Sequence, residues 1–128
     1  MIRVFATISV RPGCLPQALD CYRFLVPAVM AKEAGCLEYV PLVDLDLNLH
    51  NQDKDEASIL VSECWQSVAD FKAHLAMDHC VVFRGMIAPF LSRGIRIRVM
   101  QEVADATCVS ADVLHKMGGI ASPDQGEE

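Results

Sequence analysis

The sequence predicts an α+β domain in which one antiparallel β-sheet carries its helices on a single face. Three observations lead to this prediction. Apolar and polar residues alternate with a period of two near the start of the chain, in its middle and again before residue 103. Such alternation is typical of strands. Between these stretches, apolar residues recur every three or four positions, as in amphipathic helices. The chain has 128 residues, 52% of them hydrophobic, which suffices for one core and leaves little for a second.

The first third of the chain predicts a strand followed by a long helix. The alternation over residues 2–11 indicates the strand, and Pro12 with Gly13 ends it. The helix follows from apolar residues at spacings of four and three, namely Leu15, Leu19, Tyr22, Val26 and Val29. Pro27 lies inside this helix and is expected to kink it or split it in two, and Gly35 is expected to close it.

Two further strands flank a polar loop in the middle of the chain. Residues 36–45 predict the second strand, which Pro41 places at a sheet edge or at a bulge, because proline has no N–H to donate. Residues 46–56 are polar and predict a long loop. Residues 57–65 predict the third strand.

Two short helices and a last strand complete the predicted domain. Ser67, with Asp70 three residues later, has the spacing of a helix-capping pair, and Asp78 is expected to cap the next helix. Residues 94–103 alternate again and predict the fourth strand. The resulting order, β-α-β-β-α-α-β, fits a split βαβ, ferredoxin-like fold over residues 1–103. Residues 104–128 are acidic and predict a flexible extension.

The second face of this sheet is too apolar to be left in water. With the other residues of each strand turned toward the helices, that face would present Phe5, Val40, Leu42, Leu60, Cys64 and Met100. The chain has no further helices to cover it. We therefore expect a homodimer in which two such sheets pack face to face.

Composition excludes some partners and indicates a compartment. The net charge of −6 disfavours binding to the nucleic-acid backbone, and no apolar run is long enough for a membrane span. The N-terminus lacks the apolar stretch of a secretion signal, so we expect a cytosolic protein. The six cysteines form no CxxC pair. They are expected to be reduced and mostly buried, with Cys14 and Cys108 as the alternative candidates for an exposed reactive thiol.

Four residues of the central region could carry chemistry. Strand alternation places Glu63 and Trp65 under the helices, where a carboxylate must be paired or protonated. His74 and His79 lie on the apolar borders of the two short helices, and an imidazole beside a carboxylate can act as a base near neutral pH. Each has a structural alternative, with Glu63 in a surface ion pair, Trp65 in the core, and the two histidines as satisfied core residues.

The sequence offers no metal or cofactor motif. The two histidines are five residues apart, unlike the helical i, i+4 pair of zinc sites, and phosphate-binding and dinucleotide-binding loops are absent. We therefore predict neither a metal nor a cofactor. Arg96 and Arg98 point out from the last strand and could be solvated, lie at a dimer edge or contact an anion.

Two segments resemble the antibiotic biosynthesis monooxygenase family, including its quinol monooxygenase-like members. They are KEAGCLEY at residues 32–39 and SECWQSVADFKAHLAMDH at residues 62–79. The residues that match the family pattern in order and approximate spacing are Glu33, Gly35, Cys36, Tyr39, Glu63, Trp65 and His74. The resemblance covers residues 2–103 and implies a dimeric α+β barrel. The loop at 46–56 and the acidic extension depart from the family pattern.

The resemblance implies a cofactor-independent monooxygenase of small, electron-rich dihydroxy-aromatics that uses O2. His74 would be the base, and Glu63 would orient it or carry its proton. The expected substrate contacts are Trp65, Tyr39, Phe71, His79, Phe83 and Phe90. Members that degrade haem have an asparagine on the first strand and a tryptophan in the place of His74. This chain has Ala6 and Thr7 on that strand, which disfavours that branch.

Two alternatives to the monooxygenase remain. The same pocket could serve a non-catalytic, dimeric small-molecule-binding module, which needs only the apolar walls. It could also serve an isomerase of a small oxygenated metabolite. An isomerase of a phosphorylated compound would need a basic residue at the pocket mouth, and Lys72 is the nearest candidate in the sequence.

Overall fold

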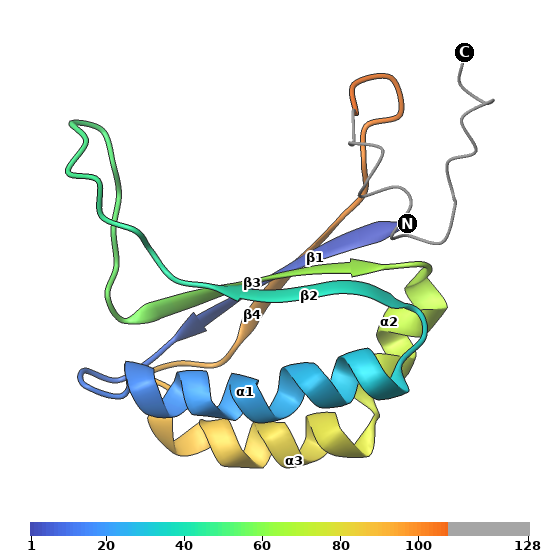
Figure 1. Cartoon of the computed structure of the whole chain (residues 1–128), viewed down its shortest axis with the longest axis horizontal. Helices are drawn as coiled ribbons and strands as arrows, with labels where there is room; N and C mark the ends of the chain where they lie inside the picture. Colours follow the sequence, from blue (N-terminus) through green and yellow to red (C-terminus); the bar gives the residue numbers. More distant parts are fainter. Residues whose placement is uncertain (108–128) are drawn as a thin grey trace.

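The computed structural model describes residues 1–107 and contains the predicted elements in the predicted order (Figure 1). The strands and helices are β1 Ile2–Ser9, α1 Leu15–Lys32, β2 Cys36–Leu42, β3 Ser58–Trp65, α2 Val68–Leu75, α3 Asp78–Ile87 and β4 Arg96–Met100. A short 3-10 helix, η1 Ala88–Phe90, follows α3. The prediction of an α+β fold is thus confirmed.

The four strands form one antiparallel sheet in the order β2-β3-β1-β4. The register pairs Val4 of β1 with Glu63 of β3 on one side and with Val99 of β4 on the other. This is the ferredoxin-like arrangement predicted from the order of elements. Strand β2 lies at an edge, as Pro41 indicated, but its irregularity falls between Cys36 and Glu38.

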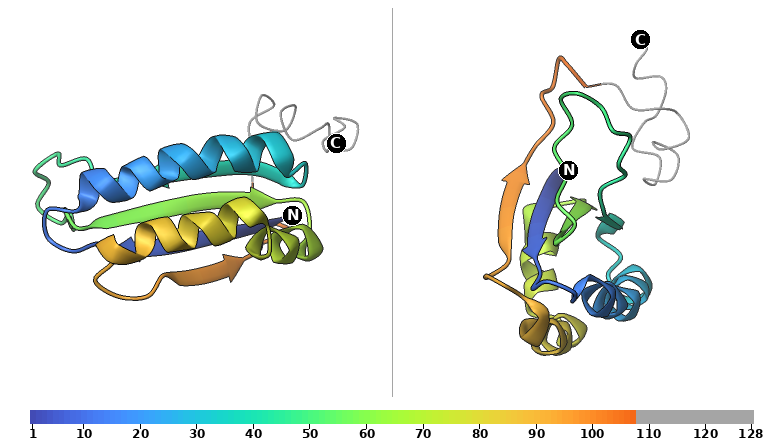
Figure 2. Two further views of the ribbon diagram at one scale, coloured as in Figure 1. Left: turned by 90° about the horizontal axis from the view of Figure 1, so that it is seen from below. Right: turned by 90° about the vertical axis from the view of Figure 1, so that its left-hand side faces the viewer.

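All three helices lie on the same side of the sheet, and α2 packs at one end of it (Figures 1 and 2). The apolar residues of β1 and β3 that face the helices, such as Val4 and Val61, are fully buried against Leu25 and Val29 of α1. This burial is the main stabilising contribution in the molecule, because each fully buried aliphatic side chain contributes about 1.5–3 kcal/mol. Strand β4 lies beside α3 rather than under a helix (Figure 2), and its Ile97 and Val99 are exposed.

The opposite face, called here the outer face, carries the apolar residues expected there. Val40, Leu42, Leu60 and Met100 are exposed, and Phe5 is half-buried. Cys64 is the exception because it is fully buried, with its Sγ atom 3.9 Å from the sulfur of Met1. Within the described residues, nothing covers the rest of this face.

The ends and interior of several elements differ from the predictions. Helix α1 continues through Pro27 as one helix, so the predicted split is wrong. Pro27 is exposed, and water can bond the carbonyl that its missing N–H leaves free. The helix ends at Lys32 with Glu33 as its C-cap, before Gly35. Asp78 is the first residue of α3, and Met77 occupies the cap position.

The predicted strands are also longer than the observed ones. The strand ladders stop at Ser9, Leu42 and Met100, apart from an isolated bridge between Val10 and Leu91, whereas alternation of side chains continues beyond each of the three ladder ends. Most of the predicted flexible extension, residues 108–128, lies outside the described residues. Among residues 1–107, no helix is long and apolar enough to cross a membrane.

Candidate functional site

A cavity of about 130 Å³ lies between the sheet and the helices. Its walls come from β1, β2, β3, all three helices, β4 and the segment before β4. The residues that line it are Ala6, Tyr22, Leu25, Tyr39, Glu63, Phe71, His74, Leu75, Cys80, Phe83, Arg84, Ile95 and Ile97. Buried ionisable groups in a largely apolar cavity are the usual signature of a binding or catalytic site.

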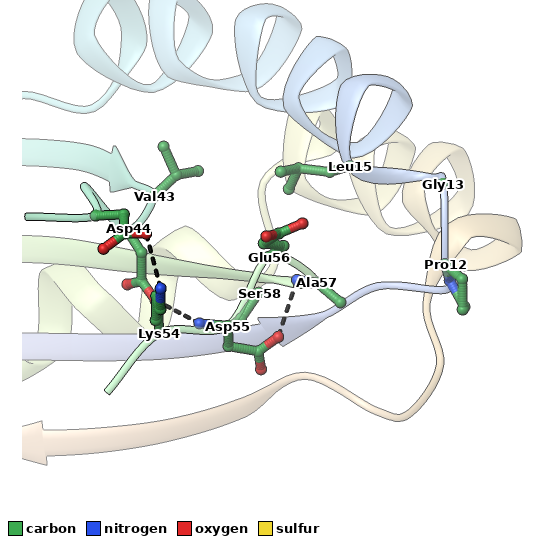
Figure 3. A pocket seen from close by; sticks show the side chains of 11 residues that line it. Pro12, Gly13, Leu15, Val43, Asp44, Lys54, Asp55, Glu56, Ala57 and Ser58 are labelled. Carbon is green, nitrogen blue, oxygen red and sulfur yellow. Dashed lines mark hydrogen bonds and ion pairs between the residues drawn. The ribbon is translucent and has the colours of Figure 1, made fainter. Parts of the chain in front are cut away.

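A larger hollow of about 630 Å³ opens between the β1–α1 turn and the long loop between β2 and β3 (Figure 3). Its lining includes an exposed ion pair in which Lys54 Nζ lies 2.7 Å from Asp46 Oδ2. It contains no buried ionisable side chain. The smaller cavity, which is lined by buried ionisable side chains, is therefore the candidate site.

Three helix ends place ionisable side chains beside this cavity. Glu33 is the C-cap of α1, His74 lies in the last turn of α2, and His79 and Cys80 lie in the first turn of α3. The cap predicted at Ser67 is confirmed, because its Oγ accepts a hydrogen bond of 3.1 Å from the Asp70 backbone N–H. This cap fixes where α2 begins, and hence where His74 lies.

Gly35 allows the end of α1 to approach α2 closely. A Cβ atom at this position would overlap the side chain of Asp70. The Gly35 carbonyl also accepts a hydrogen bond of 2.9 Å from the Gln66 backbone N–H. Only glycine fits this approach, which brings Glu33 within reach of the two histidines.

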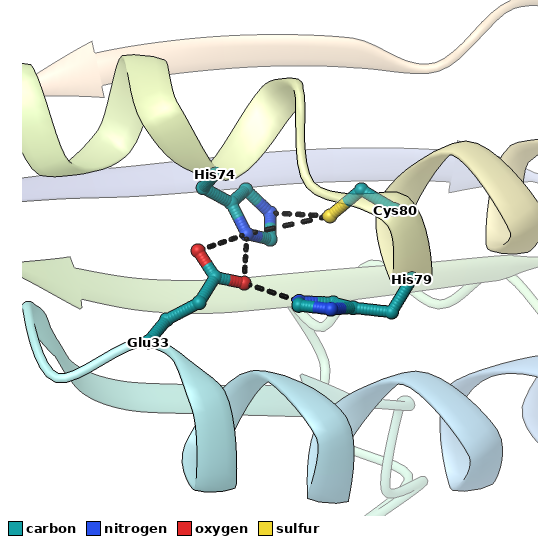
Figure 4. A group of neighbouring side chains, drawn as sticks. All are labelled: Glu33, His74, His79 and Cys80. Atoms are coloured by element: carbon teal, nitrogen blue, oxygen red, sulfur yellow. Dashed lines mark hydrogen bonds and ion pairs between the residues drawn. The ribbon is translucent and has the colours of Figure 1, made fainter.

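Glu33 bonds both histidines, and the thiol of Cys80 packs against one of them (Figure 4). His74 Nδ1 lies 2.9 Å from Glu33 Oε2 and 3.1 Å from Oε1, and His79 Nε2 lies 2.6 Å from Oε2. The Sγ atom of Cys80 is 3.4 Å from each ring nitrogen of His74. All four residues are buried. We call this group the Glu33 cluster.

Aromatic rings enclose His74 on its other sides. The centre of its imidazole lies 4.6 Å from that of Trp65, 5.6 Å from that of Tyr39 and 6.3 Å from that of Phe71. Burial lowers the pKa of His74, and the hydrogen bond and charge of Glu33 oppose this effect only in part. His74 is therefore a neutral imidazole at neutral pH, able to accept a proton.

Glu63 has a different environment from Glu33. Its Oε1 accepts a hydrogen bond of 3.0 Å from the indole N–H of Trp65. Burial raises the pKa of Glu63 to about 7, this hydrogen bond lowers it, and the charge of Glu33 raises it further. Glu63 can thus hold or release a proton near neutral pH. Burial also raises the pKa of Cys80 to about 12, so its thiol stays protonated.

The Glu33 cluster has donor atoms of the kinds that zinc accepts, all within 4.8 Å of one another. The spacing of the histidines in the sequence gave no sign of this group. Tetrahedral zinc holds nitrogen and oxygen ligands about 3.3 Å apart, given bonds of about 2.0–2.2 Å. The contacts of 2.6 and 2.9 Å between Glu33 and the histidines are shorter. The geometry is that of direct hydrogen bonds, and a metal would have to separate these atoms.

The structure brings together most, but not all, of the predicted site residues. His74, Glu63, Tyr39, Phe71 and Phe83 line the cavity. The other three predicted residues do not line it: Trp65 lies behind Glu63 and His74, His79 bonds Glu33, and Phe90 packs on the core in η1.

Two site residues were missed by the sequence analysis. The carboxylate that holds His74 is Glu33, and no direct hydrogen bond joins Glu63 to His74 within residues 1–107. Glu33 was visible only as one residue of the family pattern. The basic residue at the cavity is Arg84, whereas Lys72 is not among its lining residues. The helical periodicity of α3 could have indicated Arg84, because it lies one turn after Cys80 and therefore on the same face of the helix.

Together, the fold and the site define a ferredoxin-like domain that encloses a small-molecule cavity with buried acid–base groups. The family model for antibiotic biosynthesis monooxygenases matches residues 1–85, and the chain therefore belongs to this family. The chain is 35% identical over 100 residues to the "Probable quinol monooxygenase YgiN" of Escherichia coli K12. The match covers 76% of this chain and 95% of that protein.

Solved structures show the same fold at lower identity. A conserved protein from Methanosarcina mazei Go1 has a TM-score of 0.68 and 20% identity, over 80% of this chain and 92% of that one. Rv0793 from Mycobacterium tuberculosis has a TM-score of 0.63 and 19% identity, over 83% of this chain and 98% of that one. The resemblance noted in the sequence is thus confirmed.

Proposed function

We propose that the protein is a cofactor-independent monooxygenase of small, electron-rich dihydroxy-aromatics. The observation that carries the proposal is the pairing of His74 with Glu33 at the wall of an apolar cavity that also contains Glu63. The 35% identity to a probable quinol monooxygenase supports the substrate class. The small cavity, about 130 Å³, favours a substrate with a single ring.

In the proposed mechanism, His74 removes a phenolic proton. Its Nδ1 atom donates to Glu33, which leaves Nε2 as the acceptor on the imidazole. The resulting phenolate is rich in electrons and transfers them to O2. One oxygen atom of O2 enters the ring and the other leaves as water, so a quinol and O2 give a hydroxyquinone and water.

Other residues of the cavity support this chemistry. Glu63, whose pKa of about 7 suits proton transfer, supplies or takes up the proton needed to form water. Burial holds the pKa of Tyr39 well above its usual range, so its phenol remains a hydrogen-bond donor. The apolar walls exclude bulk water from the phenolate. No residue in this scheme requires a metal or an organic cofactor.

The experiment that tests the proposal is oxygen consumption over a series of quinols and polyphenols, with His74→Ala as the negative control. We expect oxygen uptake by the wild type that depends on His74. A wild type that binds these compounds without consuming oxygen would favour the non-catalytic binding module instead.

One observation favours the isomerase alternative. Arg84 is the only arginine or lysine among the lining residues, and no carboxylate pairs with it among residues 1–107. Its Nη2 atom donates to the Leu75 carbonyl at 3.0 Å, which holds the guanidinium at the cavity. An anionic group on the ligand would find its counter-charge there. Isomerisation of a phosphorylated metabolite without oxygen uptake would support this alternative.

The sheet-to-sheet homodimer is part of the same proposal. Four exposed apolar residues of the outer face support it, because a monomer would leave Val40, Leu42, Leu60 and Met100 in water. The cytosolic location expected from the sequence also stays a prediction.

A further inference from the structure

The loop between β2 and β3, residues 43–57, presents apolar side chains to solvent. We call this segment the β2–β3 arm. Leu45, Leu47 and Leu49 are 73%, 61% and 57% exposed. They alternate with polar residues, as in a strand whose apolar side lacks a partner. Exposed leucines are common singly, but three together on one segment indicate an interaction surface.

Hydrogen bonds within the arm hold these leucines in place. The Gln52 side-chain oxygen accepts from the Leu47 backbone N–H at 3.0 Å, and its amide nitrogen donates to the Leu45 carbonyl at 2.7 Å. Asp46 bonds Lys54 at 2.7 Å, and Asp44 accepts from the Asp55 backbone N–H at 2.6 Å. A segment ordered before binding loses less conformational entropy on binding than a flexible one.

The arm projects from the side of the sheet opposite the helices, and therefore on the side of the outer face (Figure 1). The right-hand view of Figure 2 shows the same direction. The arm extends beyond one end of the uncovered apolar face. A second sheet packed on the outer face would lie directly beside it.

The partner surface can be derived from the sheet order. In a symmetric dimer, a twofold axis along the strands places the β2 edge of one copy over the β4 edge of the other. Such an axis also keeps the same ends of the two sheets together. The arm of one copy then reaches the partner's β1 and β4, at the end where β1 finishes and β4 begins.

That part of the outer face carries a groove with the opposite charge to the arm. The groove has a volume of about 180 Å³ and is lined by Thr7, Ser9, Arg93, Arg96, Ile97 and Arg98. None of the three arginines has a carboxylate partner within residues 1–107. The arm carries five carboxylates, Asp44, Asp46, Asp53, Asp55 and Glu56, and a single lysine. Complementary charges of this kind fix the register of an interface.

We propose that the β2–β3 arm is a dimerisation arm, which packs its leucines on the outer face of a second copy and its carboxylates on that copy's arginine groove. The arm includes residues 46–56, the loop that departs from the family pattern. The proposal rests on the sheet-to-sheet homodimer proposed above, and it stands independently of the reaction the protein catalyses. It also selects the face-to-face packing in which the twofold axis runs along the strands, so that the β2 edge of one copy lies over the β4 edge of the other.

Light scattering after size-exclusion chromatography tests the proposal on the full chain. We expect the wild type to have about twice the monomer mass of 14.1 kDa at micromolar concentration. In Leu45→Asp/Leu47→Asp, we expect the dimer dissociation constant to rise at least tenfold. Val81→Asp/Val82→Asp, on the exposed side of α3, is the matched control and should leave the dimer unchanged. Circular dichroism would show that each variant is folded.

Charge reversal tests the groove. Arg96→Glu/Arg98→Glu and Asp53→Lys/Glu56→Lys should each weaken the dimer, and the combination of all four changes should recover part of the affinity. A monomeric wild type would overturn the proposal, and binding of that monomer to lipid vesicles would assign the leucines to a membrane surface instead. Dimerisation of Leu45→Asp/Leu47→Asp at wild-type strength would overturn it as well.

Discussion

The two faces of the sheet reverse the usual distribution of polar and apolar groups. The helix side buries two carboxylates and two imidazoles at Glu33, Glu63, His74 and His79, whereas the outer face leaves large apolar side chains in water. On the helix side, the chain itself supplies a partner for each of these polar groups. On the outer face, the described residues supply no cover for the exposed apolar side chains. The comparison shows that the helix face satisfies the polar groups it buries, whereas the outer face leaves large apolar side chains without cover among residues 1–107.

The largest expected effect is on catalysis at the helix side. His74→Ala should lower the turnover by about 10²–10⁴-fold, the usual contribution of a general base. His50→Ala, in the exposed arm, is the control and should retain activity. Oxygen-electrode rates on the best quinol give the comparison. Equal rates for both variants would remove His74 from the mechanism.

The next effect concerns the stability of the helix side as a function of pH. The pKa of Glu63 is about 7 in the folded protein and 4.5 in the unfolded chain, because burial disfavours the carboxylate. The contribution of Glu63 to the free energy of unfolding is therefore fully present below pH 4.5 and is lost as the pH rises through 7. The side chain of Glu63→Gln cannot titrate. As the pH rises from 4.5 to 8, the unfolding free energy of the variant should therefore increase relative to that of the wild type by up to about 3 kcal/mol.

Urea unfolding of both proteins at pH 5 and pH 8 measures this difference. The lowered pKa of His74 acts in the opposite direction, since stability from that residue is lost as the pH falls below its unfolded value of 6.5. This contribution is common to both proteins and cancels in the comparison. A difference that does not change with pH would mean that Glu63 is solvated in the folded state.

A change on the outer face should leave the site intact and weaken the dimer. In Leu60→Asp, the new carboxylate would be buried against a second sheet, at a cost of about 2 kcal/mol, or about 30-fold in the dissociation constant. Sedimentation analysis measures the dissociation constant, with Val82→Asp as the control. Unchanged dimerisation would show that the outer face is not the interface.

The smallest expected effect concerns the charge at the cavity. Arg84→Gln should reduce the affinity for 2,5-dihydroxybenzoate by about fivefold, because an exposed ion pair contributes up to about 1 kcal/mol. The affinity for uncharged hydroquinone should stay the same. Calorimetric titration of both ligands gives the two ratios, and an equal loss for both would assign Arg84 a structural rather than an electrostatic role.

The fold could be predicted because its signals are local. The alternation in β1 and β3 and the Ser67 cap depend on neighbouring residues, and each was found close to its predicted position. The strand ends were less predictable, because alternation continues at residues 43–45 although no strand pairs with them. Of the two effects expected at Pro27, the split did not occur, because the effect of an internal proline depends on solvent exposure, which the sequence does not give directly.

The site was predictable only in part because it is assembled from distant residues. His74 and Glu63 follow from the face on which each lies. The choice of Glu33 over Glu63 as the partner of His74 depends on the end of α1, 41 residues away. That choice rests on the close approach at Gly35, which only the packed structure reveals. The donor set of the Glu33 cluster was missed for the same reason.

Trp65 gives the protein an intrinsic fluorescent reporter of its own chemistry. It is the only tryptophan of the chain, and its indole contacts both His74 and Glu63. Emission from a buried indole responds to the charge of an adjacent imidazole and carboxyl group. Protonation of either residue, or arrival of a ligand in the cavity, should therefore change the emission of the whole molecule, and the occupancy of the site can be followed without any added dye.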